Sequence, residues 1–439
     1  MSKLRRFKKK EPPKGPLSVG GITVSKSMLT PGQKEAVERI EKWRKTRKSE
    51  RQQIYRIGAQ SGAGKSWLIK YLVDKYGWDR SECYVMSYTG QSVNVLRANG
   101  VISSTIHSSI MIPQEEMVLD KETGEPIMKR GIPLTTVKFK PVKYLPPTVK
   151  MIIIDEASFL PEHLEDILKG YNVPILEIGD PIQLPPVGGK QVFNMDTLDF
   201  FMEGIMRQNV DNEIYQLGTK FRFGEKIYPV DYHKEVQFLH QQETIEETFK
   251  RFLPFIKACD VIITSTNKQR QVLTDMYRKY VVQTNSPYPL EGERVICRRN
   301  NPSKELGEFF LSNGMQGVCM SDVGRSMIDK STRTFMMDFR PDVTAGTDLY
   351  YDGLICDMDY IKQPFGSNSL TEFKHLGDRF EYAYSITCHL CQGSSYNKVM
   401  FFDSFSRDRE YLNRLRYTAV TRARHKLYYM IPYKGAWTL

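Results

Sequence analysis

The sequence predicts an α/β protein with more than one domain. At 439 residues the chain is too long for one ordinary hydrophobic core. The apolar run at 54–58 leads into a glycine-rich turn and then into an apolar segment at 67–73, which indicates a strand, a turn and a helix. Apolar runs at 151–154 and 261–263 are typical of buried parallel strands. The run at 261–263 also begins a second α/β unit.

The N-terminal region combines a charged arm with the first predicted helix. Residues 1–25 form a basic, proline-containing arm, which either adds affinity for nucleic acid or is a solvated tail. A helix is predicted after Thr30, with Pro31 at its first position and Gln33 placed for a capping box. Gln33 has a second candidate role, because its amide offers one donor and one acceptor to adenine. The residues alone do not choose between the two roles.

The glycine-rich turn is a candidate phosphate loop. It consists of Ala59, Gln60, Ser61, Gly62, Ala63, Gly64, Lys65 and Ser66. A loop of this build directs backbone N–H groups at phosphates, while Lys65 reaches the β- and γ-phosphates and the Ser66 hydroxyl reaches Mg²⁺. Its first position is Ala59, where the motif usually has glycine, but the flanking strand and helix support the interpretation. The sequence therefore predicts a triphosphate site with Mg²⁺.

Two later strands end in polar residues suited to the same site. The strand at 151–154 is followed by Asp155 and Glu156, at the edge where parallel sheets collect ligands. Asp155 would hold Mg²⁺ and Glu156 would polarise the attacking water; the alternative is an ordinary helix N-terminus. The strand at 175–178 precedes a constrained loop in which Gln183 is a candidate phosphate sensor, with plain turn chemistry as the alternative.

Two regions interrupt the α/β pattern. Residues 111–150 hold a turn at 121–126 between candidate strands and a basic, aromatic second half, which predicts an inserted β-hairpin. Phe139 and Tyr144 could stack on a base, but the simpler role is burial against the hairpin. Residues 300–377 carry strand and loop signals, including a hairpin signal at 313–317, and predict an all-β insertion.

Cysteine usage and charge restrict the class of protein. The seven cysteines lack the spacing of a disulfide framework and indicate reduced thiols. Cys388 and Cys391 flank His389, but no further ligands at zinc-site spacing lie nearby, so zinc is not expected. The net charge of +12 is compatible with a polyanionic partner without naming it. No apolar run approaches the ~20 residues of a membrane span, and we expect a soluble, cytoplasmic protein.

In their order along the chain, these motifs resemble those of the superfamily 1 helicases, specifically the RecD-like and Dda-like branch that moves 5′ to 3′ on single-stranded DNA. The resemblance runs from about Leu29 to Ile431. It rests on five motifs: the phosphate loop, Asp155 to Ser158, Gly179 to Val187, Thr387 to Gly393, and Val420 to Arg424. Leu390 and Cys391 depart from the family, which usually has lysine and a small residue there.

The resemblance implies two RecA-like P-loop domains with parallel sheets and ATP in the cleft between them. It also implies that the hairpin is a pin that splits the duplex and that the second insertion is an SH3-like accessory domain. The expected divisions are a basic arm at 1–25, a first RecA-like domain at 26–110 and 151–198, a hairpin at 111–150, a second RecA-like domain at 199–299 and 378–439, and the SH3-like insertion at 300–377.

Individual roles follow from the same resemblance. Gln33 matches the adenine-reading glutamine and Gln183 the γ-phosphate sensor. Gly62, Ala63, Gly64, Lys65 and Ser66 match the phosphate loop, Ser66 and Asp155 the Mg²⁺ ligands, and Glu156 the residue that activates water. Arg207 and Arg422 match the arginines that complete the site when the cleft closes. The positions that match the DNA groove are Thr89, Thr105, His107, Asn267, Thr387 and His389.

The implied function is that of a monomeric, ATP-dependent DNA helicase acting on single-stranded DNA and on junctions of single- and double-stranded DNA. Replication, recombination and repair are the expected settings, with proteins of replication or recombination as candidate partners. One alternative is an ATPase that acts on RNA or translocates without unwinding. Another is a non-catalytic nucleic-acid-binding module, although Lys65, Asp155, Glu156 and Arg422 are intact. A nucleotide kinase would lack the groove motifs and the second core domain.

Overall fold

The computed structural model describes residues 23–47, 49–117, 119–120, 123–126, 128–129, 132–133, 135–186, 190–204, 211–307, 309–324, 327–330, 333–362 and 377–433. Arg207 and most of the basic arm lie outside these residues. In the described part of the chain, every helix is too short or too polar to cross a membrane.

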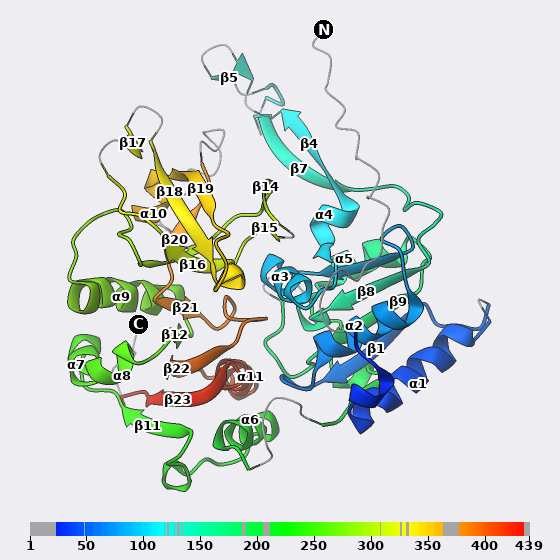
Figure 1. The fold of residues 1–439 in the computed structure, drawn as a ribbon, viewed down its shortest axis with the longest axis horizontal. Coiled ribbons are helices and arrows are strands. Elements are labelled where there is room, and N and C mark those ends of the chain that lie inside the picture. The colour runs from blue at the N-terminus through cyan, green and yellow to red at the C-terminus, as the bar shows by residue number, and fades with distance from the viewer. Residues whose placement is uncertain are drawn as a thin grey trace.

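The first half of the molecule is a parallel sheet covered by helices on both faces (Figure 1). Its strand order is β10-β1-β9-β8-β2-β3, and every pairing is parallel. The strands are β1 (Ile54–Ala59), β2 (Cys83–Ser87), β3 (Ser104–Thr105), β8 (Met151–Asp155), β9 (Ile175–Gly179) and β10 (Phe200–Met202). The helices are α1 (Pro31–Lys45), α2 (Lys65–Tyr76), α3 (Gly90–Ala98), α4 (Ile106–Ile110) and α5 (Glu162–Lys169).

Strand β8 shows why an unbroken apolar run suits this sheet. Successive side chains of a strand point to opposite faces, so a strand that is covered on both sides buries apolar residues at successive positions. Met151 and Ile153 pack into the core shared with α1 and α2. Ile152 and Ile154 pack into the other core, beneath α4 and α5. The run therefore feeds two hydrophobic cores at once.

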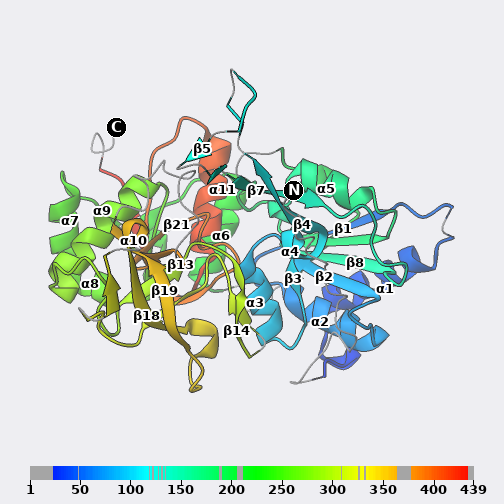
Figure 2. The same cartoon turned by 90° about the horizontal axis from the view of Figure 1, so that it is seen from above.

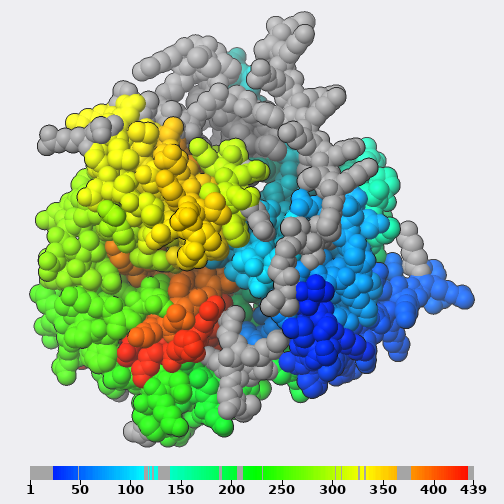
Figure 3. Space-filling model, in the orientation of Figure 1, coloured from blue at the N-terminus to red at the C-terminus, as the bar shows by residue number. Residues whose placement is uncertain are grey.

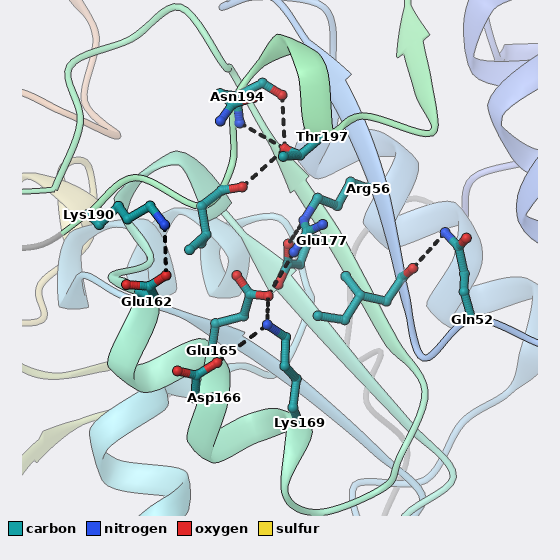
Figure 4. A network of polar contacts seen from close by, with 12 residues as sticks. Gln52, Arg56, Glu162, Glu165, Asp166, Lys169, Glu177, Lys190, Asn194 and Thr197 are labelled. Atoms are coloured by element: carbon teal, nitrogen blue, oxygen red, sulfur yellow. Dashed lines mark hydrogen bonds and ion pairs between the residues drawn. The ribbon is translucent and has the colours of Figure 1, made fainter.

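A buried ionic network ties β1 and β9 to α5 (Figure 4). The Arg56 guanidinium donates to Glu177 at 2.8 Å and to Glu165 at 2.7 Å, and Lys169 lies 2.7 Å from Glu165. Both carboxylates are fully buried. Burial raises the pKa of Glu177 to about 7, although the charge of Arg56 opposes the shift. Glu177 therefore takes up a proton near neutral pH.

The second half is another parallel sheet, with the order β11-β23-β22-β12-β21. Val399 and Phe401 of its central strand β22 pack with the α6 and α11 side, and Met400 and Phe402 pack with the α7 to α9 side. The strands are β11 (Val236–His240), β12 (Val261–Thr264), β21 (Ser385–Thr387), β22 (Tyr396–Phe402) and β23 (Ala423–Ile431). The helices are α6 (Glu213–Phe223), α7 (Ile245–Arg251), α8 (Leu253–Lys257), α9 (Asn267–Tyr277) and α11 (Arg409–Val420).

The two insertions are antiparallel. The hairpin pairs β4 (Met111–Met117) with β7 (Thr135–Pro141) and projects from the first half in Figure 1; β5 (Met128–Lys129) pairs with β6 (Ile132–Pro133). The larger insertion has a sheet of β13 (Arg294–Cys297), β16 (Gln316–Cys319), β17 (Ile328–Asp329), β18 (Thr334–Pro341), β19 (Tyr351–Asp357) and β20 (Phe380–Tyr382). It also has the pair β14 (Asn301–Leu306) and β15 (Phe309–Leu311), and helix α10 (Met358–Lys362).

Short helical turns complete the described chain. They are η1 (Lys26–Met28), η2 (Ala157–Phe159), η3 (Met195–Thr197), η4 (Pro229–Asp231), η5 (Arg278–Val282) and η7 (Asp342–Thr344).

The predicted α/β fold with two parallel-sheet units is confirmed, but three strands cross the expected divisions. β10 at 200–202 pairs with β1, so the first sheet extends past residue 198. β13 and β20 pair with each other in the insertion sheet, outside the expected range of 300–377. Each of these strands is only three or four residues long, and its partner lies far away in sequence. Periodicity along the chain does not reveal such pairings.

Two local interpretations are wrong. The signal at 313–317 is a turn with Gly314 at φ 88°, but it joins β15 to β16, which pair in different sheets, so it makes no hairpin. Phe139 and Tyr144 are not buried against their hairpin, because they are 59% and 74% exposed. A two-stranded ribbon has no second layer in which to bury them.

The two halves meet along α3 and α11, which lie at the junction in Figure 2. Arg414 of α11 donates to Gln191 at 2.8 Å, and Leu184 N–H donates to the Thr418 hydroxyl at 3.1 Å. The insertion also reaches the first half, since Asn94 of α3 donates to the Ser312 hydroxyl at 2.8 Å. In Figure 3 the yellow surface of the insertion accordingly meets the cyan surface of the first half.

Candidate functional site

A cavity of about 350 Å³ lies between the two halves. Its lining on the side of the first half includes the phosphate loop and the end of β8, and on the other side it includes Arg422 and the loop at 393–395. Seven of the predicted site residues line it together: Gly62, Gly64, Lys65, Ser66, Asp155, Glu156 and Arg422. The sequence separates these residues by more than 350 positions, and the fold brings them to one place.

The phosphate loop has the backbone that its glycines allow. Gly62 and Gly64 have φ values of 85° and 81°, in the left-handed region that favours glycine. Gly64 is the N-cap of α2, so the free N–H groups of the first turn face the cavity. Ala63 between them is buried in the core and anchors the loop. Lys65 is 8% exposed, and its Nζ lies 3.5 Å from the Gln60 carbonyl oxygen.

Gln33 has both polar ends engaged. Its side-chain Oε1 accepts from the Thr30 backbone N–H at 2.9 Å, and its backbone N–H donates to the Thr30 hydroxyl. These two bonds complete the predicted capping box. Its Nε2 donates to the carbonyl oxygens of Ala63 and Gly64. The side chain is fully buried, so it supports the phosphate loop from below. Adenine reading by Gln33 stays a prediction, because a base could contact this amide only after the buried side chain becomes accessible.

Asp155 and Glu156 end β8 beside Lys65. Burial, and then the neighbouring charge of Glu156, raise the pKa of Asp155 to about 7, while Lys65 acts in the opposite direction. Glu156 has a φ of 53°, which turns the chain sharply at the strand end. Its Oε2 is buried and finds no hydrogen-bond partner among the residues that the structure describes. A buried carboxylate oxygen without a partner is costly unless a ligand supplies one.

Arg422 reaches across the junction from the second half. Its guanidinium donates to the carbonyl oxygens of Thr418 and Ser394 and, at 3.1 Å, to the hydroxyl of Ser61 in the phosphate loop. The side chain is 3% exposed and lines the cavity. A guanidinium fixed by several bonds presents its positive charge in a defined place. The geometry thus puts a second cation, besides Lys65, against the same cavity.

Gln183 does not line this cavity. It is fully buried, and its Nε2 donates to Asp180 Oδ2 at 3.3 Å. Its Oε1 has no hydrogen-bond partner in the described chain. Contact between Gln183 and a γ-phosphate stays a prediction. Arg207 lies outside the described residues, so its role in completing the site also stays a prediction.

The cavity fits a nucleoside triphosphate with Mg²⁺. Three polar atoms of lining residues are buried without a partner in the described structure, namely Trp67 Nε1, Glu156 Oε2 and Ser394 Oγ. Within the described residues, no group of three His, Cys, Asp or Glu side chains forms a metal site. Mg²⁺ commonly binds through one or two protein oxygens together with phosphates and water, and Ser66 and Asp155 offer such oxygens here.

The predicted DNA residues follow the carboxyl ends of strands in both sheets. Thr89 and Thr105 come at the ends of the neighbouring strands β2 and β3, and each hydroxyl caps the following helix. Thr387 ends β21, and exposed Asn267 follows the adjacent strand β12. His107 and His389 are half-buried, and burial lowers the pKa of both imidazoles. Thr89, Thr105 and His107 thus form one group on the first sheet. Asn267, Thr387 and His389 form another on the second sheet.

Two interface residues escaped the sequence interpretation. Asp180 lies inside the motif from Gly179 to Val187, and Tyr417 lies three residues before the motif from Val420 to Arg424, but neither was assigned a role. In the structure the Tyr417 hydroxyl donates to Asp180 Oδ2 at 2.7 Å across the junction. The motif positions were visible in the sequence, whereas the contact depends on how the two halves pack.

Two known families match this chain. Residues 28–248 match the family described as AAA domain, and residues 382–430 match the UvrD-like helicase C-terminal domain. The uncharacterized protein R530 of Acanthamoeba polyphaga mimivirus is 21% identical over 357 residues, which cover 72% of this chain and 69% of the viral protein.

Solved helicase structures share the fold. The Bacteroides Pif1 bound to single-stranded DNA is 16% identical, with a TM-score of 0.52 and coverage of 93% of this chain and 95% of that one. The Pif1 helicase from Bacteroides in complex with ADP-AlF3 and single-stranded DNA is also 16% identical, with a TM-score of 0.51 and 92% of both chains covered. The predicted fold of two RecA-like units is thereby confirmed.

Proposed function

The chain belongs to the AAA domain family, and on that premise we propose that it is a superfamily 1 helicase of the Pif1- and RecD-like branch. It would use ATP to move 5′ to 3′ along single-stranded DNA and to separate duplex DNA. The observation that carries the proposal is the single cavity lined by Lys65 of one half and Arg422 of the other. A site divided in this way is complete only while the halves are together. ATP hydrolysis at this site would then be coupled to the relative movement of the two halves.

The residues around the cavity would have different roles in ATP hydrolysis. The N–H groups at the start of α2 and the Lys65 ammonium would hold the phosphates, and Ser66 and Asp155 would hold Mg²⁺. Glu156 would accept the proton of the attacking water. Arg422 would neutralise charge that spreads over the phosphoryl oxygens, and Arg207 is proposed to assist it. Bound ATP and Mg²⁺ supply the cleavable phosphoanhydride bond and a divalent positive charge.

A groove for single-stranded DNA is proposed along the carboxyl ends of both sheets. Thr89, Thr105 and His107 would contact the strand from the first half, and Asn267, Thr387 and His389 from the second. Their hydroxyl, amide and neutral imidazole groups suit hydrogen bonding to phosphates and sugars more than charge neutralisation. As the cleft closes and opens, the two groups would approach and separate along the strand. The proposed working form is a monomer, with proteins of replication or recombination as candidate partners.

Strand displacement from tailed duplexes tests the proposal. We expect ATP-dependent release of the labelled strand from a DNA duplex with a 5′ single-stranded tail, and little release from a duplex with a 3′ tail or blunt ends. Lys65→Ala is the control that removes nucleotide chemistry. Release only from the 3′-tailed duplex would overturn the polarity. ATP hydrolysis without any release, or release only from RNA, would favour the alternative of an RNA-directed or purely translocating ATPase.

A further inference from the structure

Three donors converge on one buried carboxylate oxygen beside the phosphate loop. Asp180, in the loop after β9, is fully buried. Its Oδ2 accepts from Ser61 N–H at 2.8 Å, from Gln183 Nε2 at 3.3 Å and from the Tyr417 hydroxyl at 2.7 Å. Ser61 and Gln183 belong to the first half, whereas Tyr417 belongs to α11 of the second. The oxygen therefore gains its third donor only when the halves are in contact.

The same stretch of α11 contacts the first half at neighbouring points. Thr418 accepts from Leu184 N–H, one residue beyond Gln183. Arg422, two residues after α11 ends, donates to the Ser61 hydroxyl, while Asp180 accepts from the Ser61 backbone N–H. Tyr417 is 3% exposed, and burial together with Asp180 raises the pKa of its phenol well above the ordinary value, so it remains a neutral donor. A hydroxyl donating to a carboxylate makes a strong, short hydrogen bond.

We propose that Tyr417 is a positioning residue for ATP hydrolysis, an inference that rests on the proposed function. Its hydroxyl fixes Asp180, and Asp180 in turn orients the phosphate loop through Ser61 and the candidate sensor through Gln183. Gln183 depends on this arrangement, since its Oε1 has no partner in the described chain and its amide donates to Asp180. When the cleft opens, the hydroxyl leaves Asp180 and the loop and sensor lose their common support. Closure restores them before the chemical step.

The variant Tyr417→Phe removes only the hydroxyl, and Tyr429→Phe is its matched control. Tyr429, on β23 of the same half, is also buried and donates to a buried aspartate, Asp403, at the same 2.7 Å. Each substitution deletes one hydrogen bond and leaves one buried carboxylate with a partner fewer, so the structural costs are comparable. Asp403 does not line the cavity. Thermal unfolding of both variants verifies that match.

Two measurements separate positioning from a merely structural role. We expect Tyr417→Phe to lower kcat for DNA-stimulated ATP hydrolysis about tenfold with KM for ATP changed by less than about twofold, while Tyr429→Phe stays close to wild type. Without nucleotide, amide hydrogen exchange at residues 59–64 should be faster in Tyr417→Phe than in wild type or Tyr429→Phe. Combining Tyr417→Phe with Asp180→Asn should slow hydrolysis no further than Asp180→Asn alone, because both act through one carboxylate.

Equal kcat values in the two phenylalanine variants, or unchanged exchange at 59–64, would overturn the role of Tyr417. Fully additive effects of Tyr417→Phe and Asp180→Asn would also contradict action through Asp180. Failure of the proposed function gives a different result. In that case the wild type itself hydrolyses no ATP, while hydrogen exchange still reports whether the Tyr417 hydroxyl orders the phosphate loop.

Discussion

At the residue scale, Arg422 connects the two halves chemically. It is held by the carbonyl oxygens of its own half and donates to Ser61 of the other. We expect Arg422→Ala to lower kcat for ATP hydrolysis about 10²- to 10³-fold, because a preorganised cation that stabilises developing charge is lost. Binding of a fluorescent ADP analogue should weaken only a few-fold, since the phosphate loop remains.

The control for this prediction is Arg409→Ala, which removes the same charge from an exposed position at the start of α11, the helix that precedes Arg422. Steady-state kinetics and nucleotide titration of both variants make the comparison. Normal turnover in Arg422→Ala would show that another residue neutralises the transition state. An equal loss of turnover in Arg409→Ala would show that the loss in Arg422→Ala comes from the change in net charge and not from the position of Arg422.

Residues of the candidate site were predictable where their chemistry is local. Lys65, Ser66, Asp155 and Glu156 directly follow apolar strands or a glycine-rich turn, so the sequence pattern predicts both their type and their place. Gln33 and Gln183 were open to two interpretations, and the structure gives both amides bonds within the protein. Such bonds depend on the packing of distant segments. Tyr417 illustrates the limit, because its partner is 237 positions away.

At the scale of elements, the hairpin of β4 and β7 leaves its aromatic residues in solvent. Phe139 and Tyr144 are 59% and 74% exposed, so they contribute little to packing. We expect Phe139→Ala and Tyr144→Ala to slow strand displacement several-fold, because each removes a surface on which a separated base could stack. ATP hydrolysis on single-stranded DNA should change less than about twofold. An exposed apolar residue elsewhere, Leu349→Ala, is the matched control.

Comparing strand displacement with ATP hydrolysis in these variants tests whether the hairpin separates the duplex. Equal losses of strand displacement and ATP hydrolysis would mean that the aromatic residues support the fold and not duplex separation. Unchanged strand displacement in both variants would place the separating surface on another element.

The ionic network of β1, β9 and α5 predicts a pH dependence of stability (Figure 4). The pKa of Glu177 is raised to about 7 in the folded protein, above the ordinary value of 4.5. Folding therefore retains a proton that the unfolded chain releases, and the resulting stabilisation is complete below pH 4.5 and lost as pH rises towards 7. The slope for one such proton is at most about 1.4 kcal/mol per pH unit.

Glu177→Gln removes this titration and keeps the size of the side chain. We expect the thermal unfolding midpoint of the variant, relative to wild type, to rise between pH 5 and pH 7. The same measurement on Glu162→Gln, an exposed carboxylate in the neighbouring helix α5, should show no such trend. A difference between Glu177→Gln and wild type that is constant with pH would contradict the raised pKa.

Strands with a continuous or alternating apolar pattern were predictable, and short strands were not. β8 and β12 are apolar up to their last residue because both faces of their sheets are covered, and in β9 only the buried Glu177 interrupts the apolar run. β10, β13 and β20 are too short for a periodic signal, and their places are set by partners such as Ile57–Ala59, which lie far away along the chain. The boundaries at 198, 300 and 377 were displaced for that reason.

At the scale of the whole molecule, the two halves and the insertion form one continuous arrangement. The halves join through α11 and the loop after β9, and the insertion contacts α3 through Ser312. At the junction of the two halves, Lys65, Asp155 and Arg422 line a common cavity. The order of the motifs predicted that two domains would share a site. The contacts that hold the domains together depend on three-dimensional packing and could not be derived from the order alone.

The most direct test of the account is the initial rate of ATP hydrolysis by wild type and Glu156→Gln, each with and without single-stranded DNA. The account predicts strong stimulation of the wild type by DNA. In Glu156→Gln it predicts a loss of about 10²-fold or more with nucleotide binding retained, because the buried base that accepts the proton of water is gone. A wild type that DNA does not stimulate, or a Glu156→Gln variant that hydrolyses ATP at the wild-type rate, would contradict a motor built on this cleft.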